Sequence, residues 1–186
     1  MTQQISLSDA FYDIGENQFL THISHIVLLD NKEIGSVLLS IYDWGSAENL
    51  HAGRQWLSKD CTYLGRLRRY FFDDDKASAK LPKMIGQGII GHRKALIFDD
   101  IMLNPLEMDK GFESKAIELS IEKYKNNCSF LLFPGWSATA CRIGVESYES
   151  VYYFQQFGLH EIDDFMMIRY LDESILNNKI SSKINT

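Results

Sequence analysis

One segment, residues 95–125, limits what this chain can fold into more than any other. It starts with the apolar run ALIFDDIML, which is typical of a buried strand. Asn104 and Pro105 end that run, because proline lacks the backbone N–H that a strand ladder needs. The next residues have the spacing of one helical face, which comprises Phe112, Ala116, Ile117, Ser120, Ile121 and Tyr124. The segment therefore predicts a strand, a loop and a helix that begins near Gly111.

The flanking sequence supplies further strands and helices. HISHIVLLD and IGSVLLSIYDW are rich in β-branched residues and are joined by DNKE, which predicts a hairpin from His22 to Trp44. Helices are predicted over residues 8–21, 46–72 and 147–157. SFLLF and FMMIRYL are predicted strands, and Gly158 is a natural helix end.

This element order predicts one mixed α/β (α+β) domain over residues 1–174, with a twisted sheet flanked by helices. Residues 175–186 are polar and aperiodic, and we expect a flexible tail there. Two arrangements of the front half stay open. Either residues 46–72 are a helical insertion after the hairpin, or the hairpin is the first strand pair and residues 83–103 hold later strands.

Composition excludes several classes of function. The formal net charge of −6 argues against a non-specific nucleic-acid binder. No apolar run is long enough to cross a membrane, and the first residues do not resemble a signal peptide. Cys61, Cys128 and Cys141 lack metal-like spacing, so we expect reduced thiols in a cytoplasmic protein. His22 and His25 should face opposite sides of a strand, which argues against a metal site.

The predicted helix start is the first candidate binding site. The first N–H groups of a helix have no internal partner and carry partial positive charge, so they suit a phosphate. An alternative stays open, in which Asp109 is the N-cap and Gly111 only shapes the turn.

The strand–loop–helix resembles the Gcn5-related N-acetyltransferase (GNAT) family, whose acetyl-coenzyme A motif runs approximately V-x-P-x-x-[RQ]-x-x-G-x-[GA], followed by Ser and an apolar helix. The matching positions are Leu103, Pro105, Lys110, Gly111, Ser114, Ala116 and Ile117. FQQFGL followed by a final strand is similar to the family's Y-x-x-x-G-F ending. The resemblance covers residues 95–171 and implies a mostly antiparallel sheet with a splayed cleft.

The resemblance also implies a cofactor and its contacts. Acetyl-coenzyme A would be the co-substrate, and its acceptor would be an amine on a small molecule or a protein. The backbone of Leu103 would pair with the pantetheine arm. The loop that holds the pyrophosphate would comprise Met108, Asp109, Lys110, Gly111, Glu113 and Ser114.

Four positions depart from the family pattern, and one of them is Ser147, which replaces an Asn often found before the next-to-last helix. Met108 replaces an Arg or Gln, and Glu113 replaces a small residue. A pyrophosphate charge about 5–6 Å from Glu113 would cost about 3 kcal/mol at an effective dielectric near 20, which predicts weaker coenzyme binding. Phe154 replaces the Tyr that protonates the departing thiolate, and a phenyl ring cannot donate a proton. Tyr153 is adjacent but points about 100° away on a helix.

An acetyltransferase also needs a base. In the resembled family a carboxylate on the strand before the loop often has this role, which selects Asp99 and Asp100. Strand alternation places them on opposite faces, without indicating which one faces the cleft. Alternatively, both lie near a strand edge in water. Acidic lining that also includes Asp163 and Asp164 would suit a cationic amine.

Two other hypotheses remain. The chain would be a catalytically inactive GNAT-like binding module if the altered loop no longer supports chemistry. It would be an unrelated α/β interaction domain if SYESVYYF lies at a partner or homodimer face.

Overall fold

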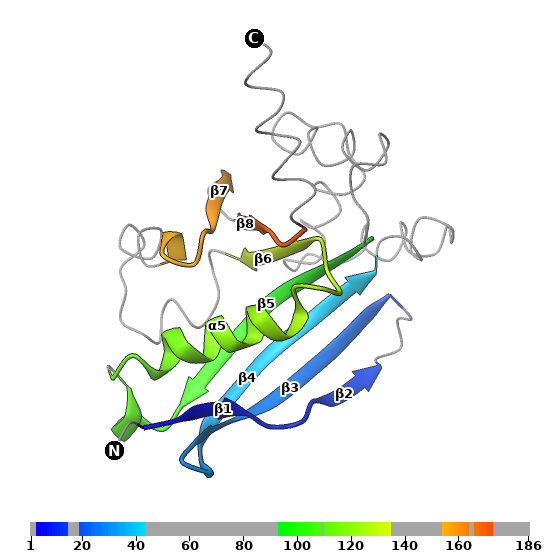
Figure 1. The fold of residues 1–186 in the computed structure, drawn as a ribbon. Helices are drawn as coiled ribbons and strands as arrows, with labels where there is room; N and C mark the ends of the chain where they lie inside the picture. Colours follow the sequence, from blue (N-terminus) through cyan, green and yellow to red (C-terminus); the bar gives the residue numbers. More distant parts are fainter. Residues whose placement is uncertain are drawn as a thin grey trace.

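A computed structural model describes residues 3–14, 19–43, 93–108, 110–134, 154–163 and 166–172. These residues form an eight-stranded sheet with one long helix, α5, across one face (Figure 1). The strands are β1 Ile5–Leu7, β2 Phe11–Ile14, β3 Leu20–Leu29, β4 Lys32–Asp43, β5 Lys94–Leu103, β6 Phe130–Pro134, β7 His160–Asp163 and β8 Met166–Tyr170. The 3₁₀ turn η1 spans Pro105–Glu107, and α5 spans Phe112–Tyr124.

The sheet is mostly antiparallel. Its order is β1-β3-β4-β5-β6-β8-β7, and β2 also pairs with β3. The one parallel pair among the described strands is β5 with β6, and α5 connects the two. The described part of the chain therefore confirms a mixed α/β architecture with a mostly antiparallel sheet.

The hairpin of β3 and β4 forms as predicted. Its turn residues Asp30 and Asn31 have φ of 49° and 67°, which short polar side chains tolerate. Gly35 then lets β4 approach β5 closely. A Cβ atom at Gly35 would lie 2.1 Å from the carbonyl oxygen of Met102 and 2.7 Å from the Leu103 side chain.

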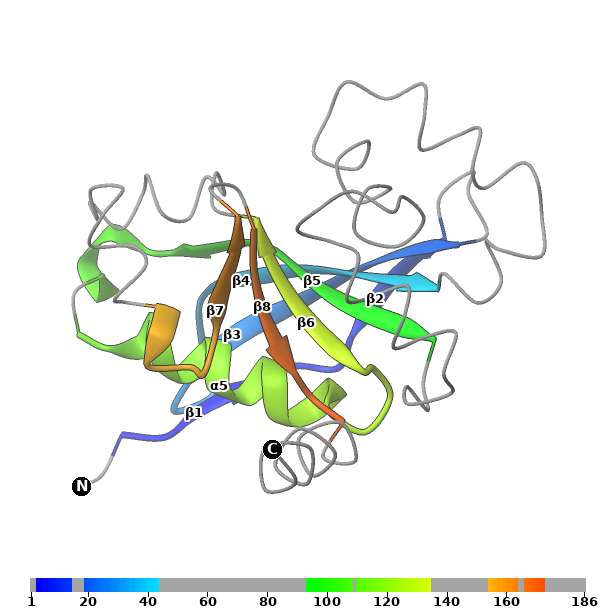
Figure 2. The ribbon, with the colours of Figure 1, turned by 90° about the horizontal axis from the view of Figure 1, so that it is seen from above.

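The core lies between the sheet and α5 (Figure 2). Ile23, Leu39 and Phe98 are directly opposite one another on β3, β4 and β5, and all three are buried in it. Ser120 lies on the apolar face of α5, but its hydroxyl donates to the carbonyl of Ala116 at 2.8 Å. That bond satisfies a polar group that would otherwise be costly to bury.

A buried polar pair also ties α5 to β3. Tyr124 Oη lies 2.7 Å from His25 Nε2, and His25 Nδ1 lies 2.9 Å from the carbonyl oxygen of Ser8. A carbonyl oxygen only accepts, so Nδ1 carries the proton and Tyr124 donates to Nε2. Burial raises the pKa of Tyr124 well above its usual value and lowers the pKa of His25. The tyrosine therefore remains a donor and the histidine remains neutral.

One prediction about local structure is wrong, and two of the described strands were not predicted. Residues 11–14 form β2 instead of part of a helix over residues 8–21, because pairing satisfies backbone groups that β3 would otherwise expose at its edge. β1 and β7 were not predicted, and they pair antiparallel with β3 and β8, respectively. The predicted helix over 46–72 and the tail lie outside the described residues, as does most of the helix over 147–157. Gly158 has a φ of 72°, which suits its predicted place after a helical turn.

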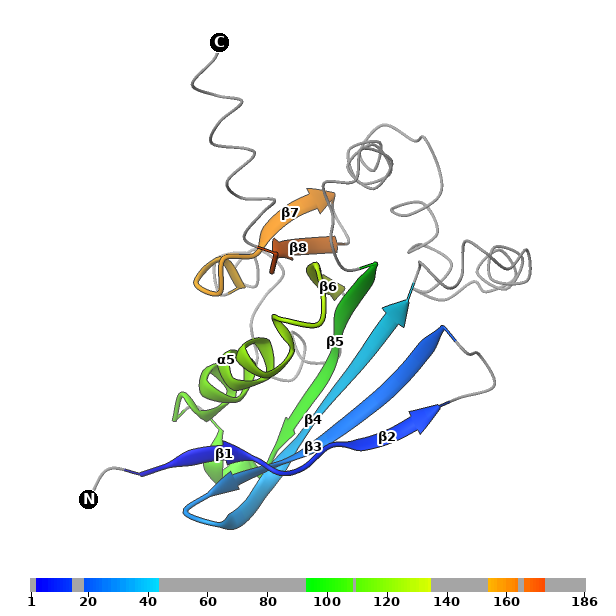
Figure 3. The same ribbon diagram turned by 45° about the vertical axis from the view of Figure 1, so that its right-hand side comes forward.

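β5 and β6 part in mid-course. They pair only between residues 95–97 of β5 and residues 130–132 of β6. β5 then continues to Leu103 beside β4, whereas β6 continues to Pro134 beside β8. Figure 3 shows the two ribbons separating in this way, with the start of α5 towards the same end as the end of β5. We refer to this divergence as the β5–β6 split.

Candidate functional site

A β-bulge in β5 sets the direction of the two candidate catalytic carboxylates. The register between β4 and β5 shifts so that Asp99 has no directly opposite residue. Phe98 and Ile101 both belong to the core beneath α5. Asp99 and Asp100 lie between them, so the bulge directs both towards the other face of the sheet. The prediction that they lie on opposite faces is therefore wrong.

Asp99 ends a chain of hydrogen bonds that crosses three strands. Ser40 on β4 donates to Asp99 Oδ2 at 2.5 Å, and His22 Nδ1 on β3 lies 2.9 Å from Ser40 Oγ. Asp13 on β2 is directly opposite His22. Residues at paired positions share a face, so Asp13, His22 and Ser40 form one polar row on the face away from α5.

This chain of hydrogen bonds determines which ring nitrogen of His22 carries the proton. The single hydroxyl hydrogen of Ser40 is directed to the carboxylate of Asp99. Ser40 Oγ can then only accept from the imidazole, so Nδ1 of His22 carries the proton. In the neutral ring Nε2 is therefore the basic nitrogen. Ser40 is fully buried and His22 is exposed, so the chain connects solvent with the bulge.

A cavity of about 480 Å³ lies along this row. Ligand pockets commonly have volumes of about 300–1,000 Å³. Its lining comes from β2, β3, β4 and β5 and comprises Phe11, Tyr12, Asp13, His22, Ile23, Ser24, Leu38, Leu39 and Asp99. Phe11 and Tyr12 are 63% and 62% exposed, which is unusual for aromatic side chains on an ordered strand.

Glycine is required at the start of α5 for its conformation. Gly111 is the backbone N-cap with φ of 78°, and a glycine has no side chain to cap the helix. The side chain of Asp109, the alternative cap, lies outside the described residues. A Cβ atom at Gly111 would meet no atom of the described residues within 4 Å, so this part of the structure leaves space beside the turn. The helix start offers backbone N–H groups to an anion there.

The other predicted loop residues are spread around this turn. Leu103 is buried at the end of β5. Met108 is partly buried and packs against the core, so it contributes an apolar contact where an Arg or Gln would contribute donors. Ser114 is half-buried in the first turn of α5. The side chain of Asp109 lies outside the described residues.

The charged side chains near the turn favour a bound anion less than the backbone N–H groups do. Lys110 Nζ lies 2.9 Å from Glu107 Oε2 in an exposed ion pair. Such pairs are weak, so the lysine can be redirected to a ligand at little cost. Glu113 is only 8% exposed in the first turn of α5. Its carboxylate favours the helix dipole but opposes a bound pyrophosphate.

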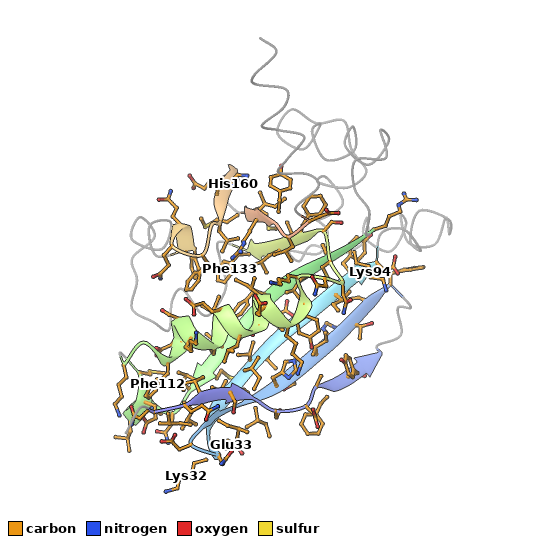
Figure 4. The ribbon with its side chains drawn as sticks, viewed as in Figure 1. Lys32, Glu33, Lys94, Phe112, Phe133 and His160 are labelled. Atoms are coloured by element: carbon orange, nitrogen blue, oxygen red, sulfur yellow. The ribbon has the colours of Figure 1, made fainter. Side chains whose placement is uncertain are left out.

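Aromatic rings pack beside the β5–β6 split. Phe133 stacks with Phe98 at a centroid distance of 5.5 Å and lies 3.8 Å from Phe154. Figure 4 shows Phe133 on the β6 side of α5 and Phe112 at the helix start. Phe154 is 1% exposed, so its ring is part of the core. Tyr153, the predicted substitute for the missing tyrosine, lies outside the described residues.

The remaining candidates lie elsewhere. Asp163 ends β7, at the edge of the sheet beyond β6 and β8, and Asp164 lies outside the described residues. Cys128 is buried, and burial raises the pKa of its thiol to about 12, so it is no nucleophile at neutral pH. Cys61 and Cys141 also lie outside the described residues. No group of three metal-ligating side chains occurs among the residues that the structure describes.

His22 and Ser40 were not among the predicted site residues. The only sequence signal for them was that strand alternation places His22 and His25 on opposite faces, which the structure confirms. A scan of protein-family models and searches of curated proteins and of solved structures found no match. No helix in the part of the chain that the structure describes is long and apolar enough to cross a membrane.

Proposed function

We propose that this chain is a GNAT-like N-acetyltransferase that binds acetyl-coenzyme A beside α5 and transfers its acetyl group to an amine. The observation that carries the proposal is the β5–β6 split with the Gly111 turn at its open end. Parallel strands joined by a helix normally continue to pair. Two strands that part instead provide the arrangement that a ligand arm between them requires.

The two ends of the coenzyme would meet different features. The pyrophosphate would bind the N–H groups at the start of α5, where the space beside Gly111 is open. The amide-containing pantetheine arm would follow the end of β5 past Leu103. The acetyl group would then approach the bulge at Asp99, close to where β5 and β6 part. This path joins the anion site to the face that carries the acidic side chains.

Calorimetric titration with acetyl-coenzyme A tests the proposal, with pantetheine and ADP as partial ligands. We expect saturable binding of the whole coenzyme, weaker binding of each fragment and a rise in Tm that grows with coenzyme concentration. Release of free thiol in the presence of a mixture of primary amines would establish transfer. No binding and no Tm shift at millimolar coenzyme would refute the proposal.

A catalytically inactive coenzyme-binding module is the second candidate. Phe154 favours it, because this buried phenyl ring packs against Phe133 and has no proton to donate, whereas the resemblance expects a tyrosine at this position of the sequence. This candidate predicts coenzyme binding without thiol release. The variant Phe154→Tyr separates the two candidates, since a gain in thiol release would indicate a site that lacks only its acid.

A further inference from the structure

The cavity along the polar row lies on the face of the sheet away from α5, and the proposed coenzyme path does not use it. Its position follows from the register, because Asp13, His22 and Ser40 are directly opposite one another while the neighbouring row packs beneath α5. Its lining includes Asp99, which lies next to the β5–β6 split. A ligand in the cavity would thus approach the proposed acetyl group from the opposite face.

We propose that this cavity binds the acceptor, a primary amine with an aromatic or aliphatic body, and that His22 takes the proton of its ammonium group. The inference rests on the proposed function for the transfer step, but the binding step can be tested without coenzyme.

The charges of the lining select a cation. Asp13 and Asp99 contribute two carboxylates, and the described residues that line the cavity include no lysine or arginine. An ammonium group would gain charge-assisted hydrogen bonds there, whereas a carboxylate or phosphate would meet like charge.

The apolar side chains of the cavity lining favour an acceptor with an apolar body. Phe11 and Leu38 lie beside the polar row on the same face, and Phe11 is 63% exposed. Covering that ring would remove apolar surface from water and can add a cation–π contact with the ammonium group. The acceptor is therefore expected to carry an apolar body next to its amine.

The hydrogen-bond chain determines which ring nitrogen of His22 can take up the proton. Nδ1–H donates to Ser40 and Ser40 donates to Asp99, so Nε2 carries the available lone pair. Among the residues that the structure describes, Asp13 from β2 and Asp99 from β5 are the charged groups that face the ring, Asp99 through Ser40. Both are negative and stabilise the imidazolium that forms. Ser40 and Asp99 are positioning residues in this scheme.

The step balances without a further reactant. The ammonium group loses one proton to His22 Nε2, which later passes it to water. The neutral nitrogen attacks the thioester carbon, a C–N bond forms and the C–S bond breaks. The second proton of the nitrogen passes to the coenzyme thiolate, which leaves as the thiol.

The binding step is tested by NMR or calorimetric titration of the full chain with 2-phenylethylamine in the absence of coenzyme. The neutral 2-phenylethanol is the matched ligand, and Glu118→Gln on the exposed side of α5 is the matched charge variant. We expect at least tenfold weaker binding of the alcohol, at least threefold weaker binding of the amine to Asp13→Asn, and unchanged binding to Glu118→Gln. Equal affinity for amine and alcohol would overturn the inference.

The role of His22 is tested by the pH profile of acetyl transfer to 2-phenylethylamine. General-base catalysis contributes about 10²–10⁴ in rate. We therefore expect His22→Gln to lower kcat about 100-fold and to remove the acidic limb of the profile, with little change in KM. Ser40→Ala should shift that limb with a smaller loss of kcat. Wild-type turnover in His22→Gln alongside a large loss in Asp99→Asn would assign the base to Asp99 and overturn the role of His22.

The two proposals fail in different ways. Amine binding without coenzyme binding would refute the acetyltransferase and retain the cavity as an amine site. Coenzyme binding without amine binding would refute the cavity as the acceptor site and retain the acetyltransferase.

Discussion

The hydrogen bond from Tyr124 to His25 joins residues 99 positions apart, and the variant Tyr124→Phe tests how much it contributes to the fold. The substitution removes only the hydroxyl group. His25 is fully buried, so its Nε2 would lose its donor in a place that water does not reach. A buried acceptor left without a partner costs about 1–3 kcal/mol. We expect the free energy of unfolding in urea at pH 7.5 to fall by about that amount.

A double-mutant cycle with His25→Leu identifies the cause. In that background Tyr124→Phe leaves no unsatisfied imidazole nitrogen, and replacing both partners by apolar groups is close to neutral. The cost of Tyr124→Phe should therefore be much smaller in the His25→Leu chain. Equal costs in the two backgrounds, within about 0.5 kcal/mol, would show that the bond is not what stabilises α5 on β3.

The same histidine predicts a pH dependence. Burial, together with the nearby positive charge of Lys123, lowers the pKa of His25 below its usual value of 6.5, against the opposing effect of the Ser8 carbonyl. Below pH 6.5 the unfolded chain takes up a proton that the folded chain does not, so stability decreases as the pH falls. Urea unfolding at pH 7.5 and 5.5 should show this decrease, and His25→Leu should reduce it. An unchanged pH dependence in His25→Leu would contradict the assignment.

Three further substitutions test the loop and its surroundings. Gly35→Ala should destabilise the fold by about 3 kcal/mol or more in urea unfolding, because its Cβ would collide with the backbone of β5; a change below about 1 kcal/mol would contradict the close approach. Gly111→Ala should cost only about 1–2 kcal/mol, from the left-handed backbone alone, since the space is open. Glu113→Gln should tighten coenzyme binding by up to about 100-fold in calorimetry, which is equivalent to about 3 kcal/mol. The control variant Glu118→Gln should leave binding unchanged. No difference between the two variants would place the pyrophosphate away from Glu113.

Local patterns were sufficient to predict several elements. The alternation and β-branched residues of the hairpin, the apolar run of β5 and the helical spacing of α5 are all local, and each element formed within a few residues of its predicted bounds. The turn at Gly111 was also predictable, because few residues other than glycine adopt a φ of 78° at a helix start.

The candidate site depended on two irregularities that no local pattern indicates. The two-residue hairpin turn pairs Leu29 with Lys32. If that register continued unbroken along the strands, Thr21 would lie opposite Ser40. The irregularity at Val27 shifts the register by one residue and brings His22 there instead. A shift of one residue exchanges the faces of a strand, so it decides which side chains meet.

The second irregularity is the bulge that directs Asp99 and Asp100 to one face. Bulges arise from how neighbouring strands fit together, and these strands are separated by about fifty residues of chain. The sequence by itself therefore determined the elements and the glycine turn, because those depend on neighbours along the chain. Only the tertiary structure decided that His22, Ser40 and Asp99 form one hydrogen-bonded chain, because the strand registers bring them together.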